Sequence, residues 1–399
     1  MTEKGFDEAG LARMERVMRG DVPTEVPGYV YAVHRKGQTV LRTHGTFGAN
    51  GAGAAMAQDT IFRVASITKP VTAAAAMMLV EDGVLTLDGP VDPFLPELAN
   101  RKVLKRMDSP LDDTEPARRP ISLRDLLTMR MGLGAIMVWP SAWPIQHAMD
   151  ERGVSPGPVL FAGSSDDYMK GLADLPLVHQ PGEGWLYDTG LNVAGILIAR
   201  ASGKKLSAFM EERIFGPLGM VDTAFFVPEQ KRHRLSDCYT KDQATGAFNA
   251  FDPSGGSGFL SRPAHEAGNG GLVSTVPDFL AFMRMLHGFG EADGRRVLSR
   301  QTVELMRTDA IAPAHKAAQP FFFGEGGGWG LGMSVATKKT ESFTNAGRFG
   351  WDGGFGTSAY SDPVADLTGV LFTQRTMDSP VAPKVFNDFW TQAYAAIGS

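Results

Sequence analysis

Strand-like segments gather at the two ends of this chain instead of alternating with helices along it. Near the N-terminus, residues 28–33 and 38–43 flank Lys36-Gly37, which predicts a β-hairpin. Near the C-terminus, three further segments have the pattern of strands, namely residues 330–336, 357–361 and 367–373. This clustering argues against a parallel doubly wound sheet. It predicts an α+β fold in which both ends share one antiparallel sheet.

Helical patterns occupy the outer ends and the middle of the chain. Residues 6–18 and 382–396 read as helices, and we expect both to cover the sheet. In the middle, the clearest helices are predicted at residues 71–81, 123–128, 192–201, 206–214 and 277–286. We therefore predict a discontinuous sheet domain of residues 1–62 and 325–399 and a mainly helical domain of residues 63–324. The active site is expected at their interface.

Charge and composition argue against several classes of protein. The net charge is −5 and no run of five like charges occurs, so we expect neither a nucleic-acid partner nor a membrane partner. No apolar stretch approaches the ~20 residues of a membrane span, and the N-terminus lacks a signal-peptide pattern. The single cysteine, Cys238, fits a reducing compartment and reads as an inert thiol. These features predict a cytoplasmic protein.

Ser66 and Lys69 stand at the start of a long apolar segment. On a helix, this spacing places both side chains on one face. Pro70 is tolerated only in a first turn, so we expect the helix to begin near Ser66. There the helix dipole would favour a developing oxyanion. Burial is expected to lower the pKa of Lys69 and make it a base for a serine nucleophile.

Two other serine motifs compete with Ser66. Residues 202–205 (Ser-Gly-Lys-Lys) repeat the spacing, but they follow a predicted helix and contain the glycine and lysines of a helix C-terminus. Residues 153–157 match Gly-x-Ser-x-Gly, but Pro156 lacks the N–H that an esterase oxyanion hole needs. We interpret the first motif as a helix stop and the second as a turn.

Metal and cofactor chemistry find little support in the sequence. The eight histidines include no His-x-x-x-His pair, and the glycine run at 324–328 lacks the Gly-Lys-Ser/Thr ending of a phosphate loop. We predict no metal site and no cofactor. A Ser-His-Asp triad stays open, since no histidine has a distinguishing context.

With these residues in view, the chain resembles the serine β-lactamase and penicillin-binding-protein superfamily. Within it, the class C β-lactamase-like branch, and particularly the family VIII carboxylesterases, is most similar. Four blocks occur in the family's order, at residues 62–69, 81–88, 122–128 and 180–187. The resemblance spans nearly the whole chain and implies a β-lactamase/transpeptidase-like fold.

The resemblance implies a role for Tyr187 as the tyrosine of a Tyr-x-Asn motif. In the family this tyrosine moves the proton between nucleophile and leaving group, and a cationic Lys69 is expected to pull its pKa down. Whether Lys69 or Tyr187 is the working base stays open.

The third motif of the family corresponds to Trp351-Asp352-Gly353. The resemblance implies that these residues bind the substrate, with the strand backbone lining it. It also implies that the backbone N–H of Gly354 joins that of Ser66 as the oxyanion hole.

Two departures from the antibiotic-hydrolysing pattern favour uncharged esters. Thr189 stands where β-lactamases usually have asparagine, so an amide donor is missing from this substrate-binding position. Trp351 replaces a lysine that would contact the β-lactam carboxylate.

We therefore expect a serine hydrolase that cleaves small-molecule carboxylic esters through an acyl-Ser66 intermediate. Apolar residues at 136–140, 143–144 and 321–323 either border the cleft, which would favour short, apolar acyl groups, or pack between the two lobes. The alternatives are a β-lactamase or D-amino-acid peptidase or amidase, an acyltransferase, and a non-catalytic ligand-binding relative. The oligomeric state, including a homodimer, stays open.

Overall fold

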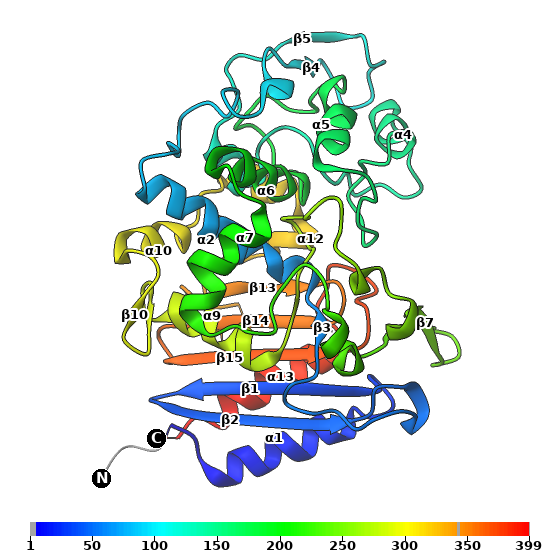
Figure 1. The fold of residues 1–399 in the computed structure, drawn as a ribbon, viewed down its shortest axis with the longest axis vertical. Helices are drawn as coiled ribbons and strands as arrows, with labels where there is room; N and C mark the ends of the chain where they lie inside the picture. The colour runs from blue at the N-terminus through cyan, green and yellow to red at the C-terminus, as the bar shows by residue number, and fades with distance from the viewer. Residues whose placement is uncertain (1–4, 341–343, 399) are drawn as a thin grey trace.

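The computed structural model describes residues 5–340 and 344–398, which fold around a seven-stranded antiparallel sheet (Figure 1). The strand order is β11-β12-β13-β14-β15-β1-β2. The N-terminal hairpin of β1 (Gly28–Arg35) and β2 (Gln38–Gly45) joins the sheet beside the C-terminal strand β15 (Leu367–Thr373). The prediction that both ends share one antiparallel sheet is thus confirmed.

The other C-terminal strands are β13 (Phe349–Gly353) and β14 (Thr357–Asp362). The continuous strand expected at 330–336 is wrong. The structure instead has a hairpin of β11 (Gly327–Trp329) and β12 (Ser334–Ala336), with a turn between them. Gly332 adopts φ 78° in that turn, a left-handed conformation that breaks an extended strand and favours glycine.

Side chains of β1 alternate between two hydrophobic cores. Tyr29, Tyr31 and Val33 face the helices α1 (Glu8–Gly20) and α13 (Lys384–Ala395), which pack against each other on one side of the sheet. Val30 and Ala32 belong to the other core, which they share with the helical part of the chain. The two terminal helices therefore cover the sheet as predicted.

The opposite face carries α9 (Val276–His287), and beyond it lies the buried helix α2 (Thr68–Glu81). Only the last two residues of α2 escape full burial, as expected for a helix that is apolar all round. Against α2 packs α6 (Thr189–Ser202), which ends at Gly203 with φ 67°. That left-handed cap confirms the second Ser-x-x-Lys motif as a helix stop.

The remaining elements are short. The helices are α3 (Leu123–Leu127), α4 (Pro144–Glu151), α5 (Ser165–Ala173), α7 (Leu206–Met210), α8 (Gly216–Leu218), α10 (Arg300–Met306), α11 (Pro313–Ala317) and α12 (Pro320–Phe323). The small two-stranded sheets are β3 (Phe62–Arg63) with β8 (Val273–Ser274), β4 (Lys102–Leu104) with β5 (Thr114–Pro116), β6 (Cys238–Lys241) with β7 (Phe248–Asp252), and β9 (Glu291–Ala292) with β10 (Arg295–Arg296).

The helix that follows α6 is shorter than predicted. The α-helix expected at 206–214 ends at Met210, and a π-helical turn follows it (Glu211–Phe215). The boundaries at residues 62/63 and 324/325 stay a prediction. Among the helices of residues 5–340 and 344–398, none is long and apolar enough to cross a bilayer.

The contact between β15 and the helical part predicts a large effect for Phe372→Ala. Phe372 is fully buried, with its ring against those of Phe62 and Phe279. We expect the free energy of unfolding to fall by about 3–5 kcal/mol in urea denaturation, because a cavity replaces the ring. Val364→Ala, at a residue 71% exposed, should change it by less than ~0.5 kcal/mol. A similar small loss for both variants would contradict this packing.

Candidate active site

Ser66 lies in a tight 3-10 turn (Ala65–Ile67) that leads directly into α2. The preceding residue, Ala65, adopts φ 47°, a left-handed conformation that residues with a Cβ rarely take. The chain therefore turns sharply out of β3, and the Ser66 side chain stays partly exposed while its neighbours are buried. A strained turn that presents one serine is typical of a functional site.

Lys69 is fully buried in the first turn of α2, and its amine uses all three of its donor positions. It donates to Ser66 Oγ at 2.9 Å and to the Asn269 carbonyl at 2.7 Å, and Asp188 Oδ1 lies 2.7 Å from Nζ. Such a set of three acceptors fits an ammonium group.

The pKa of Lys69 is raised, so the expectation of a lowered pKa is wrong. Burial acts to lower the pKa, but the negative charge of Asp188 and the nearby Tyr187 outweigh it. The apolar sequence of α2 gives no sign of the counter-charge, which comes from a distant segment. Lys69 is therefore a cation at neutral pH.

Tyr187 faces the same serine from the turn before α6. Its ring centroid lies 4.5 Å from Lys69 Nζ, and its hydroxyl oxygen accepts a 2.6 Å hydrogen bond from Trp351 Nε1. Burial raises the pKa of Tyr187, and the lowering effects of Lys69, Ser66 and Trp351 do not cancel that rise. The expected lowering of this pKa is also wrong, because the cost of desolvating the phenolate outweighs the attraction of Lys69.

Trp351 and Asp352 point to opposite faces of β13, as successive strand residues do. Trp351 contacts Tyr187, whereas Asp352 accepts a hydrogen bond from Tyr360, whose ring packs on Trp390 of α13. The Asp352 side chain therefore lies away from Ser66. Thr189 is fully buried at the start of α6, and its expected role in substrate binding stays a prediction.

Gly353 allows the end of β13 to lie against the segment that precedes Ser66. A Cβ at Gly353 would collide with the Val64 carbonyl and the Thr357 hydroxyl, which themselves form a 2.8 Å hydrogen bond. Gly354 follows in an exposed position with open space beside it. The pairing of its N–H with that of Ser66 as an oxyanion hole stays a prediction.

Aromatic side chains form a wall around Tyr187. Phe322 lies 5.0 Å from the Tyr187 ring between centroids, and Trp185 lies 5.8 Å from it. The 321–323 segment therefore borders the site, as expected. Ala135 donates a backbone hydrogen bond to Tyr187 at 2.8 Å, and in the loop that follows it Trp139 is 70% exposed.

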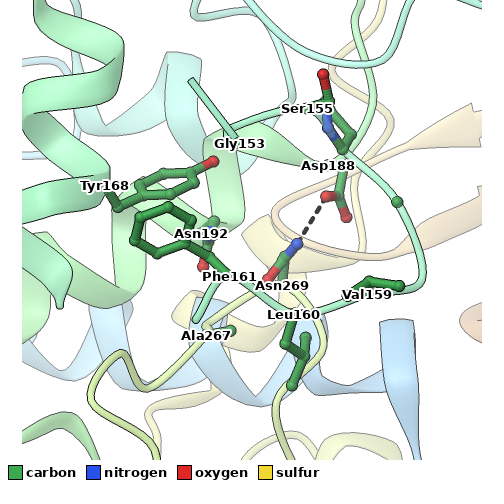
Figure 2. A pocket seen from close by; sticks show the side chains of 12 residues that line it. Gly153, Ser155, Val159, Leu160, Phe161, Tyr168, Asp188, Asn192, Ala267 and Asn269 are labelled. Carbon is green, nitrogen blue, oxygen red and sulfur yellow. Dashed lines mark hydrogen bonds between the residues drawn. The ribbon is translucent and has the colours of Figure 1, made fainter. Parts of the chain in front are cut away.

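A small pocket opens beside Asp188 (Figure 2). One side is the loop of residues 153–161, and the other side is formed by Tyr168, Asp188, Asn192, Ala267 and Asn269. The Gly-x-Ser-x-Gly motif lies in this loop, and its Ser155 donates a hydrogen bond to Asp150. Its irregular backbone supports the interpretation of the motif as a turn.

Sequence analysis missed Asp188 and Asn269. Asp188 is the residue between Tyr187 and Thr189, so a carboxylate inside the motif was the available signal. Asn269 lies in a run of glycines, and Gly268 passes so close to α6 that a Cβ would meet the Leu191 carbonyl. A polar residue within such a run marks a close approach of backbone to a site.

A Ser-His-Asp array does occur elsewhere in the fold. His287 Nδ1 lies 2.6 Å from Ser361 Oγ, and its Nε2 lies 2.9 Å from Asp366 Oδ1. Ser361, however, has no exposed surface, because it lies inside the central sheet on β14. The array therefore has no serine that a substrate could reach. Among the residues described, no three His, Cys, Asp or Glu side chains gather in a group that could hold a metal ion.

The fold has close structural relatives. EstCE1, described as a hydrolase with promiscuous acyltransferase activity, superimposes with a TM-score of 0.82 at 22% identity, covering 97% of this chain and 99% of that one. The antiparallel sheet, the paired terminal helices and the buried helix that follows Ser66 thus define a β-lactamase/transpeptidase-like α+β protein.

The chain belongs to the beta-lactamase family, whose model matches residues 14–385. Protein Rv1367c of Mycobacterium tuberculosis is 38% identical over 339 residues, which cover 83% of this chain and 81% of that protein. Lovastatin esterase of Penicillium rubens is 33% identical over 340 residues, 80% of each chain. The resemblance to the class C-like branch with its family VIII esterases is confirmed.

The burial of Cys238 predicts that its thiol is unreactive in the native protein and takes no part in the chemistry of Ser66. Burial raises the pKa of Cys238 to about 12, so we expect almost no thiolate and no reaction of the native protein with Ellman's reagent near pH ~8. One thiol per chain should react after denaturation. Rapid stoichiometric labelling of the native protein would contradict the placement of Cys238.

Proposed function

We propose that this beta-lactamase-family hydrolase is a carboxylesterase that works through an acyl-Ser66 intermediate. The observation that carries the proposal is the contact of one partly exposed serine hydroxyl with both a buried ammonium and a tyrosine. Ser66 Oγ accepts a hydrogen bond from Lys69 at 2.9 Å. A hydrogen bond between Ser66 and the Tyr187 hydroxyl acts to lower the pKa of Tyr187. A serine needs such partners to attack a carbonyl at neutral pH.

The proposed reaction has two matched halves. Ser66 Oγ bonds to the ester carbonyl carbon while its proton passes to the Lys69–Tyr187 pair, after that pair has released one proton to solvent. The backbone N–H groups of Ser66 and Gly354 would hold the oxyanion. Its collapse breaks the bond to the alcohol oxygen, which takes the proton from the pair. Water then repeats the sequence on the acyl-enzyme and releases the acid.

Charge at the site supports an uncharged acyl group. The positive charge of Lys69 is already paired with Asp188 at 2.7 Å, and Trp351 stands where a cation could have met a substrate carboxylate. The wall around Tyr187 is aromatic. The 33% identity to a lovastatin esterase also favours ester cleavage. We therefore expect short, apolar acyl esters to be better substrates than anionic ones.

The nucleophile can be tested with a matched pair of serine variants. Ser66→Ala should reduce hydrolysis of p-nitrophenyl butyrate by about 10³-fold or more and abolish labelling by a fluorophosphonate. Ser202→Ala removes the serine of the other Ser-x-x-Lys motif and should leave both measurements unchanged. Turnover or labelling that survives in Ser66→Ala would exclude the proposed nucleophile.

The substrate class can be tested by comparing kcat/KM across a panel. We expect p-nitrophenyl acetate and butyrate to exceed the hemisuccinate ester, nitrocefin and D-alanine p-nitroanilide by at least about 10-fold each. Preference for the hemisuccinate would contradict the argument from charge. Preference for nitrocefin or the anilide would instead support a β-lactamase or an amidase.

A further inference from the structure

Asp188 lies at the centre of a strained turn between Tyr187 and α6. Its backbone has φ 86° and ψ −64°, and the Thr189 N–H donates to the Tyr187 carbonyl at 3.3 Å. These values describe a γ-turn, which is rare and strained for a residue that carries a side chain. Such a conformation persists where its surroundings demand it, and it places the carboxylate beside Lys69.

The carboxylate closes a ring of three residues from three segments of the chain. Asp188 Oδ1 lies 2.7 Å from Lys69 Nζ, and Oδ2 accepts a 2.6 Å hydrogen bond from Asn269 Nδ2, which Figure 2 marks. The Asn269 carbonyl accepts from Lys69 at 2.7 Å. Each member therefore holds the other two, and the remaining N–H of Lys69 points to Ser66 Oγ.

Few other charged groups can influence Lys69. The turn before α6 presents Asp188 and Tyr187, the segment before β8 presents the amide and carbonyl of Asn269, and the turn before α2 presents Ser66. Among the contacts of Lys69 in the described part of the chain, Asp188 is thus the counter-charge. A buried ammonium without such a partner would lose its proton.

We propose that Asp188 is a positioning residue of the active site, which keeps Lys69 in its ammonium form and aligns that ammonium on Ser66 Oγ. Because its three N–H bonds are engaged, Lys69 cannot accept the serine proton in this state. That state leaves Tyr187, as a phenolate, to receive the proton of Ser66, which is the role that the family resemblance implies for it. This inference rests on the proposed function for its kinetic consequences only.

The first test measures stability against pH and needs no turnover. In Asp188→Asn, burial should bring the folded-state pKa of Lys69 below its unfolded value, so the unfolded chain binds more protons between those two values. Stability of this variant should then rise with pH relative to the wild type. We expect the difference in unfolding midpoint between the wild type and Asp188→Asn to narrow between about pH 7 and about pH 10.

The double variant Asp188→Asn/Lys69→Met controls this measurement. Because both variants lack Lys69, the difference in unfolding midpoint between the double variant and Lys69→Met should not change with pH. Asp293→Asn, which breaks an exposed ion pair with Arg284, should show a constant gap to the wild type. A gap for Asp188→Asn that is constant with pH would overturn the proposal, whether or not the protein hydrolyses esters.

The second test is the pH profile of kcat/KM for p-nitrophenyl butyrate. In Asp188→Asn we expect the rising limb of the profile to move to lower pH. We expect the plateau to fall by about 10²-fold, because the form with a protonated Lys69 and an ionised Tyr187 becomes the minor one. Asp188→Glu should recover part of the plateau. An unmoved limb, or a plateau equal to that of the wild type, would contradict the proposal.

The two tests separate the two claims. A narrowing stability gap without any wild-type turnover or fluorophosphonate labelling would support Asp188 and contradict the proposed esterase. Wild-type turnover with an unmoved profile and a constant gap would support the esterase and contradict Asp188.

Discussion

Lys69 is a positive charge without access to solvent, and the surroundings of Ser66 are arranged to compensate it. Removing the partner of a buried ion costs roughly 3–5 kcal/mol, whereas one strained backbone turn costs about 1–3 kcal/mol. The ion pair therefore outweighs the strain at Asp188. The γ-turn that results also sets the position of Tyr187, so one electrostatic constraint orients both groups that contact the serine hydroxyl.

The fold brings these groups together from distant parts of the chain. The N-terminal hairpin completes the sheet that the C-terminal strands begin, and the chain then passes through β3 into the turn of Ser66. Gly353 lets β13 lie directly against that turn. The Trp351 indole on the same strand then reaches the Tyr187 hydroxyl. Sheet and helical segments thus meet at the serine because a glycine removes the side chain that would separate them.

Local patterns predicted much of this fold. Residues 28–33 and 367–373 alternate or run apolar between turn signals, and they form β1 and β15 nearly as expected. The motif order placed Ser66, Lys69 and Tyr187 in one group. The hairpin of β11 and β12 was missed because the apolar residues Leu331 and Met333 are buried in a turn, where their pattern resembles that of a strand.

The protonation states could not be predicted from local sequence. The pKa of Lys69 depends on Asp188, which is distant in sequence and reaches it only through the packing of α6 on α2. Motif position also gave no sign that the Asp352 side chain accepts a hydrogen bond from Tyr360, which the alternation of β13 explains, while the expected lining of the substrate by the backbone of this strand stays a prediction. The position of a residue in a motif identifies it as a candidate for the site, while tertiary contacts decide its protonation state and the direction of its side chain.

The central claim is that Ser66 carries the acyl group during turnover. Mass spectrometry of protein quenched in acid during steady-state hydrolysis of a slow p-nitrophenyl ester tests it most directly. We expect one acyl group per chain, located on the tryptic peptide that begins at Val64, and none in Ser66→Ala. Turnover with no acyl adduct, or an adduct on another residue, would show that Ser66 does not carry the acyl group.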